Sequence, residues 1–133
     1  MKTGVAIALA MGLAACGPPP AQVAGTYSGS QNLIVTGGAG EIGSQVVSVN
    51  QTGGDLSFTL SMCQVKASAD GATTFHIGGF KCSKLLASQS WDLTGDGKVT
   101  SNSNSLSIAI TGKGKNGSVE APFTWSFSGS RGF

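Results

Sequence analysis

Charged residues are scarce in this chain. Only 11% of its 133 residues are charged, and eight Lys/Arg against six Asp/Glu leave a net charge of +2. Domains that bind nucleic acid gather basic side chains on one face, and this chain has too few of them for such a face. Nucleic acid is therefore not an expected partner. The length is that of one domain, and the hydrophobic fraction of 40% is sufficient for a single core.

Histidine and cysteine are also rare, with one and three copies. A structural zinc site needs four ligands, and His76 with two cysteines outside any Cys-x-x-Cys spacing falls short. His76 alternates with Phe75 and Ile77, which predicts a position on a solvated strand face. No Gly-x-Ser-x-Gly elbow marks a nucleophilic serine, and the acidic residues lie in separate segments. We therefore expect no enzyme activity and no cofactor.

Long apolar runs are missing after the N-terminus. The run Gly4–Gly12 follows the positive charge of Lys2 and is too short to span a bilayer, as in a secretory signal peptide. The next residues, Leu13–Cys16 (Leu-Ala-Ala-Cys), resemble the bacterial lipobox. The resemblance implies a diacylglyceryl group on the Cys16 thiol, removal of residues 1–15 and acylation of the new amino group. The alternative is a signal peptide with an incidental cysteine.

Two or more acyl chains give stable membrane attachment, whereas one holds a protein only marginally. The chain is therefore expected to be a membrane-anchored lipoprotein. Gly17 stands where an inner-membrane retention Asp would follow Cys16 in the sorting rule of enterobacterial lipoproteins, which implies the outer membrane, facing the periplasm. Residues 16–23 contain Pro18–Pro20 and predict a stiff tether. A disordered leader without a spacing role is the alternative.

Lipidation of Cys16 leaves Cys63 and Cys82 as the remaining thiols, in a compartment that favours oxidation. A disulfide between them is the simplest expectation. It would close a loop of about twenty residues and contribute roughly 3 kcal/mol in the chain-entropy model.

Residues 24–133 have the composition and periodicity of a β domain. Glycine is abundant, with 21 copies in the chain, and disfavours long helices. Apolar and polar side chains alternate clearly in Leu56–Met62, Leu106–Thr111 and Val119–Phe127. Weaker strand signals lie at Gly25–Ser30, Gln45–Gln51, Thr73–Ile77, Ser90–Leu93 and Lys98–Ser101.

Short strands separated by turns dominate this domain. Turns are predicted at Thr52–Asp55, Asp70–Gly71, Gly95–Gly97 and Lys115–Gly117, and only Ser83–Ser88 could form a helical turn. Seven or eight strands without crossover helices predict an antiparallel meander that closes as a barrel. A β-sandwich is the alternative.

Two similar segments could close the sheet. Tyr27–Ser30 and Phe127–Ser130 share an aromatic-Ser-Gly-Ser pattern that suits two paired strands. Gly25–Tyr27 also resembles the Gly-x-Trp of the first strand in lipocalin-like (calycin) barrels, with Tyr in place of Trp. That resemblance implies a small barrel. No C-terminal helix is visible and the domain is short for that family, so ligand carriage does not follow from it.

A glycine-rich string resembles the nucleotide-binding fingerprint of extended short-chain dehydrogenases, in which Gly37, Gly40 and Gly43 would hold the spacing. In that family the glycines lead from a strand into a helix that binds the pyrophosphate. Here Ser44–Asn50 is rich in β-branched residues instead. The chain's only tyrosine, Tyr27, lies upstream, so the family's Tyr-x-x-x-Lys pair is absent. We predict a flexible loop between strands.

Asp92, Thr94, Asp96 and Gly97 match positions one, three, five and six of a calcium-binding loop. Position twelve is Ser103, which lacks the bidentate carboxylate of that loop. A hairpin turn is the preferred interpretation, with weak calcium binding as the alternative.

The aromatic side chains are expected to fill the core, with a ligand-stacking platform as the alternative: Trp91, Trp125, Phe123, Phe127, Phe58 and Phe75. The expected function is a non-catalytic structural or protein-interaction role in the cell envelope. A small-ligand-binding barrel is the second hypothesis. A third, an integral outer-membrane barrel, rests on the terminal Phe133, but Arg131 breaks the alternation that such barrels need.

Overall fold

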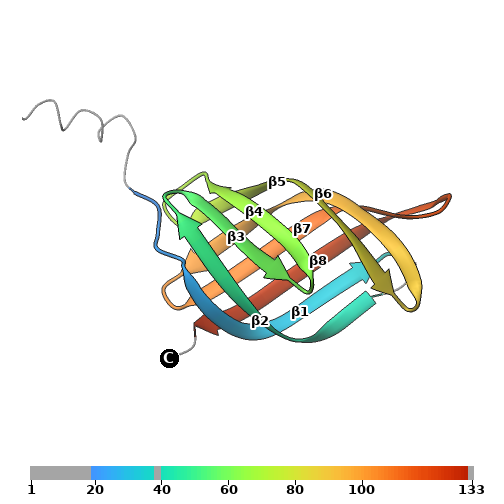
Figure 1. Cartoon of the computed structure of the whole chain (residues 1–133), viewed down its shortest axis with the longest axis horizontal. Coiled ribbons are helices and arrows are strands. Elements are labelled where there is room, and N and C mark those ends of the chain that lie inside the picture. The colour runs from blue at the N-terminus through green and yellow to red at the C-terminus, as the bar shows by residue number, and fades with distance from the viewer. Residues whose placement is uncertain (1–18, 38–39, 132–133) are drawn as a thin grey trace, which may run out of the picture.

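The chain forms a closed antiparallel β-barrel in a computed structural model that describes residues 19–37 and 40–131. Each strand pairs with the next along the chain, and the last pairs with the first (Figure 1). The strands are β1 (Gly25–Val35), β2 (Gly40–Thr52), β3 (Asp55–Leu60), β4 (Cys63–Ala69), β5 (Thr74–Leu86), β6 (Gln89–Asn102), β7 (Ser105–Asn116) and β8 (Val119–Arg131). The predicted all-β barrel is confirmed, with eight strands, and the sandwich alternative is not formed.

Several sequence predictions fall outside the described residues. They concern residues 1–18, which contain the expected signal peptide, the acylation site Cys16 and Gly17, together with residues 38–39 and Phe133. In the part of the chain that is described, no helix has the length and apolar character needed to cross a membrane.

The predicted closing pair brings the ends of the domain together. In the β1–β8 ladder, Ser28 pairs with Ser130, Gly29 with Gly129 and Ser30 with Ser128. A Cβ atom added to Gly29 would collide with the backbone carbonyl of Ser128. Glycine is therefore needed for the two strands to approach this closely, and the shared aromatic-Ser-Gly-Ser pattern is confirmed as the point of closure.

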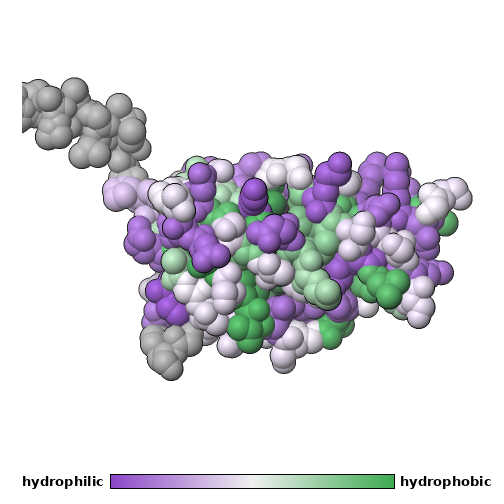
Figure 2. Space-filling view, viewed as in Figure 1, coloured by the Kyte–Doolittle hydropathy of each residue, from purple (hydrophilic) through white to green (hydrophobic). Residues whose placement is uncertain are grey.

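Most apolar side chains point into the barrel and most polar ones point out, in keeping with the two-residue period of a strand. The interior is filled by a continuous cluster of buried residues to which every strand contributes. The aromatic residues predicted for the core are all at most 4% exposed. On the outside, Figure 2 shows mostly hydrophilic and weakly polar residues on the visible face, with hydrophobic residues in isolated spots.

The segment before β1 covers one end of the barrel. Val23 is fully buried, and its backbone N–H donates to Oε1 of Gln51 at 2.6 Å. The hydroxyl of Tyr27 donates to the Val23 carbonyl at 2.8 Å and accepts from Nη2 of Arg131 at 2.6 Å. Ala21 also packs on the core. The last residues of the predicted tether therefore lie against the barrel.

The predicted turn at Gly95–Gly97 is wrong, because these residues lie within the continuous strand β6. Gly95 and Gly97 pair with Gly112 and Ile110 of β7. Added Cβ atoms would collide with backbone carbonyls of β7 at both positions. The glycines therefore permit close strand packing here and do not make a turn.

Three other local expectations also need correction. Met62 is not the end of a strand but a turn residue that is 90% exposed. Ser83–Ser88 is not helical: it completes β5 and forms its hairpin turn, since each residue through Leu86 has a partner in β6. The expected loop at Gly37–Gly43 is wrong from Gly40 onward, where β2 begins.

Candidate functional site

The β3–β4 hairpin is the least regularly paired part of the barrel. β3 and β4 have six and seven residues, whereas the flanking β2 and β5 have 13 each. Three residue pairs join β2 to β3 and two join β4 to β5, against eleven between β5 and β6. We call these two sparsely paired strand boundaries the seam. Side chains must hold the hairpin where the backbone ladders stop.

A disulfide closes the seam on one side. Cys63, the first residue of β4, is bonded to Cys82 of β5, with their Cα atoms 5.7 Å apart. The backbone ladder between these strands has only the pairs Ser68–His76 and Ala69–Phe75, at the other end of β4. The predicted disulfide is confirmed, and it ties the tip of the hairpin to β5.

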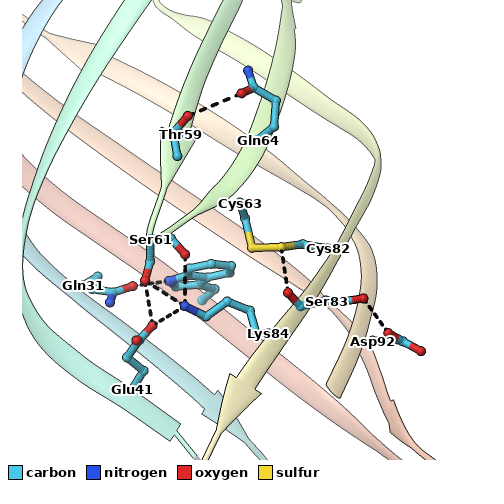
Figure 3. Close-up of a disulfide and its surroundings, with 11 residues drawn as sticks. Gln31, Glu41, Thr59, Ser61, Cys63, Gln64, Cys82, Ser83, Lys84 and Asp92 are labelled. Atoms are coloured by element: carbon cyan, nitrogen blue, oxygen red, sulfur yellow. Dashed lines mark hydrogen bonds and ion pairs between the residues drawn. A yellow bond between two sulfur atoms is a disulfide. The ribbon is translucent and has the colours of Figure 1, made fainter. Parts of the chain in front are cut away.

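A polar cluster closes the seam on the other side (Figure 3). We call it the Lys84 cluster; it consists of Gln31, Glu41, Ser61, Lys84 and Trp125. The ammonium group of Lys84, only 7% exposed, lies 2.8 Å from Oε1 of Glu41. It also donates to the carbonyl and the hydroxyl of Ser61, at 3.0 and 2.8 Å. The Ser61 hydroxyl in turn donates to Glu41 at 2.9 Å. Strands β5 and β2 are thus linked through the hairpin turn.

The backbone of the turn is bent toward Lys84. Ser61 and Met62 have φ angles of 46° and 73°, a left-handed conformation that L-residues adopt at a cost of roughly 1–2 kcal/mol each. Glycine or asparagine is the usual choice in such a two-residue turn. The hydrogen bonds from Lys84 to Ser61 compensate for this cost, because they satisfy a buried charge with the turn's own oxygens.

Trp125 forms the apolar floor of the Lys84 cluster. Its indole N–H donates to Oε1 of Gln31 at 2.6 Å. The ammonium of Lys84 lies 5.7 Å from the centre of the ring, and Phe80 packs edge-on at 6.0 Å. Cation–π attraction therefore adds to the ion pair in holding Lys84 inside the barrel.

Glu41 is the acid that neutralises Lys84. Partial burial raises the pKa of Glu41, but hydrogen bonds from Lys84, Ser61 and Gln31, together with the charge of Lys84, lower it, and the net pKa lies below the ordinary value of 4.5. The carboxylate therefore stays ionised in mildly acidic surroundings.

We expect the ion pair to make stability depend on pH. A folded-state pKa below the unfolded one contributes stability that is present above about pH 4.5 and lost as the pH falls through the lower folded-state value. Glu41→Gln should reduce the free energy of unfolding by about 2 kcal/mol at neutral pH, because Lys84 stays buried without a counter-charge.

Urea unfolding over a range of about pH 3 to 7 measures this effect. The loss of stability on acidification should be smaller in Glu41→Gln than in the natural chain. Glu120→Gln is the matched control, since Glu120 is exposed and only loosely paired with Lys113 and Lys115. Curves of the natural chain and Glu41→Gln that run parallel at all pH values would contradict the prediction.

The hydrogen bonds of the Lys84 cluster run in one direction, from Lys84 through Ser61 to Glu41. A lysine that activates a serine must be neutral and accept the hydroxyl proton. Here the Lys84 ammonium donates to Ser61, and Ser61 donates to Glu41. These contacts link β5 to β2 through the β3–β4 turn.

The other predicted site residues do not form a site with one another. Asp92 accepts a hydrogen bond from Ser83 at 2.6 Å, and Asp96 accepts one from the Gly79 N–H at 3.1 Å. With Thr94 they lie on the outside of the continuous strand β6 instead of in a calcium loop. Within residues 19–37 and 40–131, no three His, Cys, Asp or Glu side chains are grouped to hold a metal.

Sequence reasoning missed the Lys84 cluster because its strands break the hydrophobic pattern. Glu41 and Lys84 point inward, while their neighbours Ile42 and Leu85 are 77% and 71% exposed. A pattern that assigns apolar residues to the inside would place Ile42 and Leu85 in the core and the charged residues outside, which is the reverse of what is found. The signal that could have revealed the site was that Glu41 and Lys84, of opposite charge, each stand next to an apolar residue in a strand.

Comparison with known proteins identified no similar protein. No protein-family model matches the chain, and the searches of curated proteins and of solved structures found no match.

Proposed function

We propose that this protein is an exported lipoprotein, anchored through acyl chains on Cys16, with a non-catalytic structural or protein-interaction role in the bacterial cell envelope. Lys2, the apolar run and the Leu13–Cys16 segment support export and acylation. Stable attachment needs at least two acyl chains, which the lipobox resemblance implies. Gly17 supports the outer membrane, facing the periplasm, as the destination.

The observation that favours a structural or interaction role over ligand binding is that side chains fill the barrel interior. An eight-stranded barrel has room inside either for side chains or for one small ligand. Here Tyr27, Phe58, Phe123, Trp125 and Phe127 are each at most 2% exposed. Two grooves of about 410 Å³ each border the β3–β4 hairpin and are lined mostly by polar residues. We therefore favour contacts made by the outer surface.

Ligand binding is kept as a second candidate because of one buried donor. The indole N–H of Trp91, a residue 4% exposed, has no hydrogen-bond partner within the described residues. A small ligand that reaches the interior could accept this bond. Titration with a fatty acid should leave tryptophan fluorescence unchanged if the interior is occupied by side chains alone, and a saturable change would favour this second candidate.

The outward side chains argue against the outer-membrane barrel hypothesis. Membrane-spanning barrels present an apolar band to lipid. The outward, exposed residues of β8 are instead mostly polar: Glu120, Pro122, Thr124, Ser126, Ser128 and Ser130. Its large aromatic side chains, Phe123, Trp125 and Phe127, are buried in the core. We therefore assign membrane attachment to the acyl chains.

Intact mass of the protein extracted from membranes tests the proposal. We expect the mass of the chain from Cys16 onward, increased by a diacylglyceryl group and an N-linked acyl chain. Reduction should add two hydrogen atoms, one on each sulfur of Cys63 and Cys82. A mass that retains residues 1–15, or one without acyl groups, would contradict the proposal.

A further inference from the structure

Strand β2 has an open backbone edge. Its ladder with β3 contains only Asn50–Ser57, Gln51–Leu56 and Thr52–Asp55, next to a two-residue turn. Residues that flank such a turn exchange backbone hydrogen bonds, and the direction of N–H and C=O alternates along a strand. The backbone groups of the even-numbered residues of β2 therefore face β3, while the odd-numbered ones face β1.

Four of these even-numbered residues have no strand to pair with: Ile42, Ser44, Val46 and Ser48. Their partners in β1 occupy the other edge, and within the described residues the ladder with β3 does not include them. Figure 1 shows β2 diverging from β3 beyond their shared turn. An unpaired edge is a template for another extended chain.

This edge lacks the usual protection against pairing. Natural edges are protected by lysine, proline or inward-pointing charges, among other devices. Between Gly40 and Val49 the one charged residue is Glu41, which is neutralised inside the barrel by Lys84. The outward side chains include Ile42 and Val46, which are 77% and 60% exposed. The edge thus offers both free backbone groups and apolar contact.

A groove runs beside the open edge. Its volume is about 410 Å³. One wall consists of Gln45, Val46, Ser48 and Asn50 of β2, and the other of Phe58 and Thr59 of β3 with Gln64 of β4. The two walls belong to the strands between which a single added strand would lie. A second copy of the chain would bring its own β3–β4 hairpin against this one, which favours a peptide segment over a second barrel.

We propose that β2 binds an extended peptide segment, which adds to the sheet as a strand between β2 and the β3–β4 hairpin. The backbone of the segment would pair with Ser44, Val46 and Ser48, beyond the point where Glu41 contacts the hairpin turn, and an apolar side chain of the segment would lie beside Val46. This rests on the proposed interaction role and specifies its partner as a polypeptide in β conformation.

Hydrogen exchange at single amides of the full chain, purified in detergent micelles, tests strand addition directly. The probe is a synthetic peptide of alternating threonine and valine with a lysine at each end. Saturating peptide should slow exchange at Ser44, Val46 and Ser48 by about tenfold or more. The amides of Gln45 and Val47, which face β1, are already protected and should change little.

Two variants place the effect at the edge. Val46→Pro removes one N–H that faces the groove, a substitution that an edge strand accommodates, and should abolish the protection by peptide at Ser44 and Ser48. Val46→Lys adds an edge charge and should do the same if the proline variant does not fold. Ser107→Lys is the control on β7, which is paired on both sides, and should bind as the natural chain does.

Three results would overturn the inference. They are no protection at any peptide concentration, protection that is equal in Val46→Lys, and protection that rises with protein concentration alone, which would identify a second copy as the occupant. The assay does not depend on acylation, so its outcome is separate from that of the mass measurement.

Discussion

Replacing Cys16 with Ser should move the protein from the membrane fraction to the soluble fraction. Without the thiol no diacylglyceryl group can be attached, and the barrel, whose outward residues are largely polar, has no other expected means of attachment. Because each buried CH₂ contributes about 0.8 kcal/mol, the loss of the acyl chains should lower the membrane-bound fraction by more than about tenfold.

Fractionation followed by a carbonate wash measures this release. The matched control replaces the other two cysteines, Cys63 and Cys82, with Ser: this double variant lacks the disulfide but keeps Cys16, and it should stay in the membrane fraction. Cys16→Ser that persists on washed membranes would contradict the anchoring proposal, and release of both variants would show that the assay reports unfolding instead.

The strand order of this barrel follows from patterns that are local in the sequence. In β3, β7 and β8 the apolar residues recur at every second position, so that each strand has one face for the core. Turns with Gly53 and Gly117, whose φ angles are positive, mark where these strands end. Sequence alone therefore predicts an antiparallel meander and its closure.

Glycines inside strands were harder to interpret. Gly95 and Gly97 looked like turn residues, but they are required by the carbonyl groups of β7 that approach them in the folded barrel. Conversely, Ser61–Met62 and Ala87–Ser88 form turns with positive φ although none of these residues is glycine. The close approach of β7 to Gly95 and Gly97 forms only in the folded sheet, and no local pattern contains it.

The Lys84 cluster shows the same limit for the candidate site. Gln31, Glu41, Ser61, Lys84 and Trp125 are spread over 94 positions between the first and the last. Only the closed barrel brings them within hydrogen-bond distance. The two cysteines were predictable because the expected export and the lipidation of Cys16 left them as the remaining pair.

Removing the disulfide should selectively loosen the β3–β4 hairpin. Cys63→Ala with Cys82→Ala is expected to lower the free energy of unfolding by about 3 kcal/mol, since the bond closes a loop with a sequence separation of 19. The effect should be concentrated at the seam, where only three pairs to β2 and two pairs to β5 remain to hold the hairpin. Amides within β3 and β4 should therefore gain hydrogen exchange before those of β7 and β8.

Thermal unfolding and site-resolved hydrogen exchange, each with and without reductant, measure the two parts of this prediction. Reductant should lower the melting temperature of the natural chain by roughly 10 °C and leave the double variant unchanged. With the disulfide absent, the Lys84 cluster still links the hairpin tip to β2 and β5. The triple variant that also carries Glu41→Gln should therefore be less stable than the natural chain by more than the sum of the two separate effects. Strict additivity, or exchange that rises equally in all strands, would mean that the disulfide and the ion pair do not hold the same hairpin.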